Sequence, residues 1–212
     1  RIIPEGLFES TIISLLRNCG ESEVESRNIN IEPKKVNIES SIITYRHAEL
    51  ITKWIEKLEI TDEITASYEF KLLSRSQGGD VRFSSKFPTI TIIKVKGTDE
   101  ILGGYSPIAW PRGTIFYSVF TYRTSKDSFI FSFEDIIDIN SHILSRVKNE
   151  QHAIAFHFFS HYFSFGITDL SIGSSYGSCQ MNDYEKPIRE TVDNFEIEIC
   201  EIFLITKING ND

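Results

Sequence analysis

Short runs in which apolar and polar residues alternate are the feature that most constrains the fold of this chain. Most residues of Thr89–Lys96 are β-branched, and the polar segment Gly97–Glu100 separates that run from Ile101–Tyr105. Two such runs joined by a short polar turn predict an antiparallel hairpin. A further run, Ser128–Phe133, has phenylalanine at every second position. Because successive side chains of a strand point to opposite faces of a sheet, this spacing predicts β-structure.

The same reasoning predicts several other strands. Ser67–Leu73 places apolar residues on one face and charged residues on the other, which is typical of a strand with one face in water. Phe195–Ile205 is predicted to be the last strand, and a one-residue slip of its apolar phase predicts a β-bulge near Cys200–Glu201. The remaining predictions are strands at 41–45, 114–122, 142–147 and 169–172, turns at 77–80 and 111–113, and a polar loop at 173–187, with no assignment for the aromatic tract 153–165.

One amphipathic helix is predicted over residues 47–58. Its apolar stripe consists of Leu50, Ile51, Trp54, Ile55 and Leu58. Its charged residues, Lys53, Glu56 and Lys57, are expected to face water. A short helix over 5–17 precedes a polar segment, 20–39, that we interpret as a linker. These elements predict an α+β, mainly β fold: a two-layer antiparallel β-sandwich with a few peripheral helices.

Charge and cysteine content limit the classes of function. The net charge is -8, and the absence of a dense basic patch argues against nucleic-acid binding. No apolar run approaches the roughly 20 residues that span a bilayer, so we expect no membrane insertion. The sparse, odd set Cys19, Cys179 and Cys200 predicts reduced thiols and a cytoplasmic protein, with the nucleus as the alternative.

Four patterns could carry chemistry. Gly173–Gly177 matches the G-x-S-x-G string of hydrolases, but no histidine follows it, and we interpret it as a loop. His152, His157 and His161 lack an acidic partner at metal-ligand spacing, so no metal site and no cofactor are predicted. The cysteines lack a neighbouring base, and the acidic pairs of the turns, such as Asp99/Glu100, are explained as solvated charge. No catalytic residue is assigned; an enzyme of unknown reaction that uses His157, His161 or Cys179 stays the alternative.

The order of the segments resembles a known family. Gly103-Gly104-Tyr105, Asp127–Phe133 and Ser164–Leu170 are similar to consecutive segments of the TLDc domain, a β-sandwich module. The resemblance covers roughly residues 40–207 and places a TLDc domain at 40–212. Fungal members commonly carry BTB and BACK domains as well, and residues 1–19 resemble the opening helix of BACK, followed by the linker 20–39 and with no BTB domain. Three segments depart from the family pattern: 76–87, 111–123 and 151–163.

The resemblance implies a non-enzymatic protein-interaction module. TLDc proteins are associated with protection against oxidative stress, and several bind the vacuolar proton pump, the V-ATPase. The expected partner is therefore a protein, with pump subunits as one candidate. BTB-linked members are similar to adaptors of cullin ubiquitin ligases, and direct cullin binding is not expected without BTB. A degenerate gene fragment without activity is the further alternative.

An aromatic corner is the predicted binding face. It consists of Gly103, Gly104, Tyr105, Pro107 and Trp110. Tyr and Trp are common anchors of protein interfaces, which favours a partner site at this corner. The alternative interpretation is that these residues fill the core, with the two glycines at a bulge or at a close approach of strands.

Overall fold

The longest strand, β12 (Phe195–Ile208), joins two sheets in this computed structural model. The structure describes residues 36–77, 85–110, 120–134, 138–157 and 162–208, all within one compact unit that spans residues 34–212. The first two residues of β12 pair with β11 (Tyr176–Ser178). Further along, β12 pairs with β2 (Ser67–Gln77) on one side and with β3 (Thr89–Val95) on the other. β12 therefore belongs to both sheets.

The central sheet has the strand order β1-β2-β12-β3-β4-β6-β7. Its other strands are β1 (Val36–Ile38), β4 (Ile101–Ser106), β6 (Phe129–Phe133) and β7 (His142–Arg146). Among the described strands only β1 and β2 pair in parallel, and helix α2 (Tyr45–Glu56) lies between them in the chain. Parallel neighbours cannot be joined by a tight hairpin, so the helix supplies the crossover that this pair needs.

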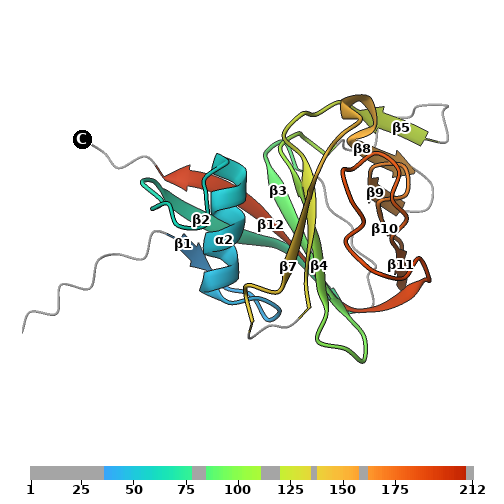
Figure 1. Cartoon of the computed structure of the whole chain (residues 1–212), viewed down its shortest axis with the longest axis horizontal. Helices are drawn as coiled ribbons and strands as arrows, with labels where there is room; N and C mark the ends of the chain where they lie inside the picture. The colour runs from blue at the N-terminus through green and yellow to red at the C-terminus, as the bar shows by residue number, and fades with distance from the viewer. Residues whose placement is uncertain (1–35, 78–84, 111–119, 135–137, 158–161, 209–212) are drawn as a thin grey trace, which may run out of the picture. The chain divides into compact units, whose positions relative to one another are not determined.

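The second sheet continues from the start of β12 in the order β11-β10-β9-β8-β5. Its strands are β10 (Leu170–Ile172), β9 (Tyr162–Phe165), β8 (Ile154–His157) and β5 (Phe120–Arg123), and one turn of 3-10 helix, η1 (Glu150–His152), precedes β8. In Figure 1, α2 and strands β8 to β11 lie on opposite sides of β3, β4 and β7. The central sheet is thus covered on both faces.

Two hydrophobic cores follow from this layering. Phe129, Phe131 and Phe133 of β6 pack with Trp54 of α2 in the first core. Ile130, which points to the other face of β6, packs with the second sheet in the other core. Coverage on both faces explains why β4 and β6 are buried throughout instead of at every second residue. The predicted mainly β sandwich of the α+β class is confirmed.

Helix α2 begins and ends two residues earlier than predicted. Its first turn is held by His47, whose Nδ1 accepts a hydrogen bond from the Thr44 N–H at 3.3 Å. It ends at Lys57, which has a left-handed φ of 58°, and the Leu58 N–H returns to the Lys53 carbonyl at 2.9 Å. The apolar stripe packs on the central sheet as expected. Within the described part of the chain, no helix is long and apolar enough to cross a bilayer.

Burial of His47 makes the stability of the domain depend on pH. The ring is almost fully buried, its edge faces Phe133 with the ring centres 4.6 Å apart, and burial lowers the pKa of His47 below its ordinary 6.5. The unfolded chain therefore takes up a proton near pH 6.5 while the folded chain does not. As a result, the free energy of unfolding decreases as the pH falls from 6.5 towards the folded-state pKa.

We expect His47→Gln to flatten this dependence, because glutamine can still accept from the Thr44 N–H but does not titrate. The measurement is urea unfolding at pH 7.5 and pH 5.5 for both proteins. Equal losses of stability in the two proteins would show that His47 is not the responsible group.

The strand predicted at 41–45 is wrong. Ser40 Oγ accepts the N–H groups of Ile42 and Ile43, each at 3.0 Å, so these amides do not pair with a neighbouring strand. The chain bends there and enters α2 at Tyr45. The strand forms earlier instead, at β1, inside the segment 20–39 that we interpret as a linker from the sequence.

Other predictions differ from the structure in detail or concern residues that the structure does not describe. β12 contains two register shifts, after Ile197 against β3 and after Ile202 against β2, on either side of the predicted bulge at Cys200–Glu201. The polar loop 173–187 contains the short strand β11, and the unassigned tract 153–165 contributes β8 and β9. Four predictions lie wholly or mostly outside the described residues: the helix at 5–17, the turn at 77–80, the turn at 111–113 and the strand at 114–122. Of the turn at 77–80 only Gln77 is described, and it ends β2. The domain assignments 1–19, 20–39 and 40–212 stay predictions.

Candidate functional site

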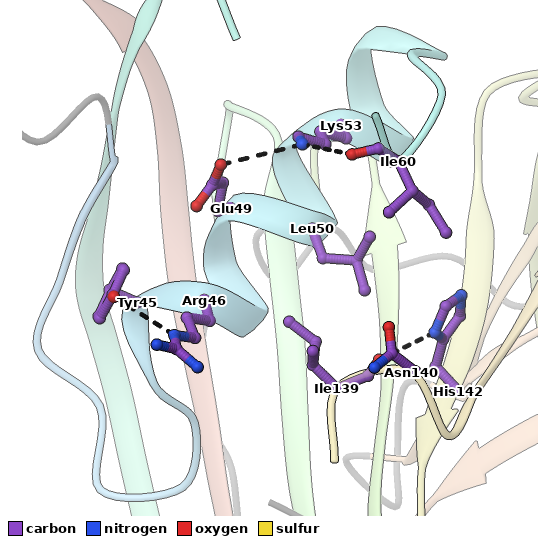
Figure 2. A pocket seen from close by; sticks show the side chains of 9 residues that line it. All are labelled: Tyr45, Arg46, Glu49, Leu50, Lys53, Ile60, Ile139, Asn140 and His142. Atoms are coloured by element: carbon purple, nitrogen blue, oxygen red, sulfur yellow. Dashed lines mark hydrogen bonds and ion pairs between the residues drawn. The ribbon is translucent and has the colours of Figure 1, made fainter. Parts of the chain in front are cut away.

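A hollow of about 250 Å³ lies beside α2, between the helix, the turn that follows it and the segment that leads into β7. Its lining residues are Tyr45, Arg46, Glu49, Leu50, Lys53, Ile60, Ile139, Asn140 and His142 (Figure 2). The helix and the segment 139–142 are far apart in the chain, and the central sheet brings them together. We call this hollow the α2 pocket.

The apolar part of the α2 pocket has a buried floor and an exposed rim. Leu50 is only 5% exposed, whereas Ile60 is 56% and Tyr45 is 46% exposed. In Figure 2, the side chains of Leu50, Ile60 and Ile139 point towards the same hollow. Exposed apolar side chains around a hollow are typical of a surface that another molecule covers.

The charged residues of the α2 pocket have different environments. Lys53 Nζ donates to the Ile60 carbonyl at 2.6 Å and lies 3.9 Å from the Glu49 carboxylate. Contrary to the expectation that Lys53 faces water, its side chain is only 13% exposed, because it fastens the turn at Ile60 to the helix. Arg46 is exposed, and its Nε donates to the Tyr45 hydroxyl at 3.3 Å.

His142 closes the pocket opposite the helix. Its Nδ1 lies 3.0 Å from the Ile139 carbonyl, and because a carbonyl only accepts, Nδ1 must carry the proton. The ring also lies 5.3 Å from the ring of Trp54, centre to centre. Ser, Thr and Cys do not occur among the described residues that line the pocket. The lining thus combines apolar side chains with groups that donate and accept hydrogen bonds, which is the composition of a binding surface.

A second hollow of about 250 Å³ lies near the same end of β6 and β7, where Phe133 and Ile143 line it. Arg189 Nε donates to the Glu100 carboxylate at 2.8 Å, and the guanidinium lies 4.8 Å from the centre of the Phe195 ring. Arg189 is thus already paired on both sides. The α2 pocket is the better candidate, because its rim combines exposed apolar residues with an exposed guanidinium.

The predicted binding residues lie mostly in the core. Gly103, Gly104 and Tyr105 are buried in β4, and Trp110 is 4% exposed. Of the five predicted residues only Pro107 is partly exposed. This placement favours the alternative interpretation, in which these residues fill the core, and their role in partner binding stays a prediction.

Trp110 is a core residue that contacts both sheets. Its Nε1 donates to Thr89 Oγ1 at 2.6 Å. Its ring meets Phe156, Phe163 and Phe165 edge to face, at 4.6, 5.0 and 6.1 Å between ring centres. Trp110 therefore fixes the second sheet to the central sheet.

Tyr105 lies on the opposite face of the central sheet. It packs on Phe129 in the core below α2, and burial raises its pKa to about 12. Because Tyr105 and Trp110 belong to different cores, they do not form one face.

The described cysteines and serines that were considered for catalysis are not poised for it. Burial raises the pKa of Cys179 and of Cys200 to about 12, so both thiols are protonated at neutral pH. Ser174 and Ser175 lie in the turn between β10 and β11, not at a strand-to-helix elbow. His152 is partly exposed and lies 3.4 Å from the Asp183 carboxylate. The structure does not describe Cys19, His161 or the side chain of His157.

Sequence reasoning missed the α2 pocket. It identified Leu50 as a core residue and Lys53 as a surface residue, but not that both line one hollow. Tyr45 and Ile60 are large apolar residues that lie just outside the predicted apolar stripe, and this displacement is the signal that could have marked them as surface anchors. Residues 139–142 line the pocket because of contacts across the sheet, and no local sequence pattern indicates this role.

Comparison with known families agrees with this architecture. The model of the TLDc domain matches residues 36–206. This range begins at β1, ends within β12 and contains every residue of the α2 pocket. No curated protein matches the chain. From the extent of the family match, which covers most of the sequence, it follows that this chain belongs to the TLDc domain family.

Proposed function

We propose that this chain is a non-enzymatic protein-interaction module of the TLDc type, and that the α2 pocket is its contact surface. The observation that carries the proposal is the combination of exposed Tyr45 and Ile60 with exposed Arg46 around one hollow. Tyrosine and arginine are enriched among interface hot spots, and the buried centre of an interface is more apolar than its rim.

The buried polar groups support binding over catalysis. The Asp169 carboxylate accepts the N–H groups of Asn182, Asp183 and Tyr184 at 2.8 to 3.1 Å. These bonds hold the loop before β12 against the second sheet. A carboxylate committed to backbone amides in this way stabilises structure and has no acceptor capacity directed at a substrate.

The partner we propose is a subunit on the cytosolic side of the vacuolar proton pump, with protection against oxidative stress as the cellular role. Membership of the TLDc family supports this choice, since several members bind the pump. A cytoplasmic location follows from the same proposal. An enzymatic function has no comparable support among the described residues.

The test is the affinity for the purified cytosolic sector of the pump, measured by biolayer interferometry. We expect Ile60→Asp to weaken binding at least tenfold, because it places a charge where an apolar contact is made; a tenfold loss corresponds to about 1.4 kcal/mol. The matched control is Val192→Asp, since Val192 is 68% exposed and does not line the α2 pocket.

Three outcomes decide the proposal. Selective loss in Ile60→Asp supports it. Equal affinity of Ile60→Asp and Val192→Asp for the pump sector would show that the contact surface is not the α2 pocket. Lack of binding by the unaltered chain would reject the pump as the partner. A cooperative thermal transition in all three proteins is the required control for folding, and it also tests the alternative of a degenerate fragment.

A further inference from the structure

We infer that the α2 pocket takes a peptide segment with one aliphatic anchor residue and a carboxylate on one side of it. This inference rests on the proposed function and specifies the chemistry of the partner. It follows from the size of the hollow, from the lining residue Arg46, which makes no ion pair with a described residue, and from the acidic Asp62 beside the opposite end.

The size of the hollow favours a side chain over a cofactor. Small-molecule sites enclose about 300–1,000 Å³, and the α2 pocket has about 250 Å³. Leu50 at its floor and Ile60 and Ile139 at its sides offer apolar contacts from three directions. One Leu, Ile or Met side chain of a partner fits this environment.

Arg46 provides the charge at one end. Lys53 is paired with Glu49 and with the Ile60 carbonyl, but Arg46 makes no ion pair with any described residue. Its contacts are the hydrogen bond to the Tyr45 hydroxyl and the Tyr45 ring, 6.0 Å away. A guanidinium has five N–H donors in a planar fork that matches a carboxylate, so Arg46 keeps donors for a ligand.

An acidic residue lies beside the other end of the pocket. Figure 2 shows Arg46 and Ile60 on either side of Leu50. At the Ile60 end, the Asp62 carboxylate accepts the Glu59 N–H at 2.8 Å. A ligand carboxylate at this end would meet like charge, which is destabilising. The carboxylate of the bound segment therefore lies at the Arg46 end.

The experiment uses the full chain and three synthetic twelve-residue peptides. The first has one leucine with two glutamates beside it in a Gly/Ser background; the second replaces the glutamates with lysines; the third replaces the leucine with serine. Isothermal titration measures each affinity, and inorganic phosphate is titrated as a free anion without an apolar group. We expect the first peptide to bind at least tenfold more tightly than the other two and more tightly than phosphate.

Two charge variants complete the test. Arg46→Glu should abolish the preference for glutamate over lysine. Lys71→Glu is the matched charge reversal and should retain the preference, because Lys71 is exposed on β2 and does not line the α2 pocket. Both residues are on the surface, and an acidic residue in the first turn of α2 favours the helix, so both variants should fold.

Equal binding of the glutamate and lysine peptides, unchanged preference in Arg46→Glu, binding of phosphate alone, or no peptide binding would each overturn the inference. Loss of pump binding in Ile60→Asp without any effect of Arg46→Glu would leave the proposed function intact and reject only the acidic segment. Peptide binding without pump binding would support the acidic segment as the ligand and reject the pump as the partner.

Discussion

Gly103→Ala is expected to destabilise this domain more than any other single methyl addition in β4. A Cβ at position 103 would lie 2.2 Å from Phe131 Cζ and 2.6 Å from the backbone oxygen of Thr91. The ring can shift only within a packed core, and the carbonyl belongs to the neighbouring strand β3. Overpacking of this kind costs about 1–3 kcal/mol, and we expect the upper end because a backbone atom is involved. Urea unfolding measures the change.

Gly97→Ala and a double variant separate two causes of destabilisation, namely backbone strain and the steric contact of the added methyl group. Gly97 has a φ of 77°, and a Cβ at this position would meet none of the described atoms within 4 Å, so its substitution reports backbone strain alone, about 1 kcal/mol. Adding Phe131→Leu to Gly103→Ala should recover part of the loss by removing the ring contact. If Gly103→Ala costs no more than Gly97→Ala, the close packing of β4 against β3 and β6 is incorrect.

Glu201→Ala is expected to have the second large effect. The Glu201 side chain is fully buried in β12 and accepts hydrogen bonds from the Ser41 N–H at 3.0 Å, Ser41 Oγ at 2.7 Å and Arg75 Nε at 2.6 Å, as well as from Ser40 Oγ. Hydrogen bonds to a charged group contribute about 1.5–3 kcal/mol. Arg75 is 43% exposed and can regain water, so most of the loss comes from Ser40 and Ser41. We expect a loss of about 2–4 kcal/mol in urea unfolding.

The pH dependence of this difference has a defined sign. Burial alone raises the pKa of Glu201, but the hydrogen bonds from Ser40, Ser41 and Arg75 outweigh burial, and the net pKa lies below the ordinary 4.5. The stabilisation is therefore complete above pH 4.5 and is lost as the pH falls through the folded-state pKa. The gap between the unaltered chain and Glu201→Ala should narrow below pH 4.5.

Glu198→Ala is the matched control, because Glu198 is on the same strand and exposed; its effect should stay within about 0.5 kcal/mol. Hydrogen exchange should become faster in residues 36–44 of Glu201→Ala, since Glu201 ties this segment to β12. Unchanged exchange there would show that β1 is held by other contacts.

The strands with the clearest alternation could be predicted from the sequence, and their surroundings could not. The hairpin of β3 and β4 and the three phenylalanines of β6 follow from local pattern and turn residues. That both faces of these strands are buried depends on α2 and on the second sheet, which are distant in the chain. The strand expected at 41–45 fails for a similar reason: Ser40 and Ser41 bind Glu201, which lies in the last strand of the chain, and no local pattern indicates that contact.

The candidate site could also be predicted only in part from the sequence. Gly103 and Gly104 stand out in the sequence, and the structure explains them by the rings of Phe131 and Phe165 that rest on them. An aromatic residue near a turn, such as Trp110, is expected at a surface corner, but Trp110 fills the core between the sheets. The α2 pocket combines a helix with residues 139–142, and only the sheet order brings the two together.

Hydrogen exchange of the chain, alone and bound to the cytosolic sector of the vacuolar proton pump, tests most directly whether this TLDc domain works by binding through the α2 pocket. Bound partner should slow exchange in residues 45–60 and 138–142 and leave β8 to β11 unchanged. Protection confined to the second sheet, or no protection in a complex that forms, would contradict the account.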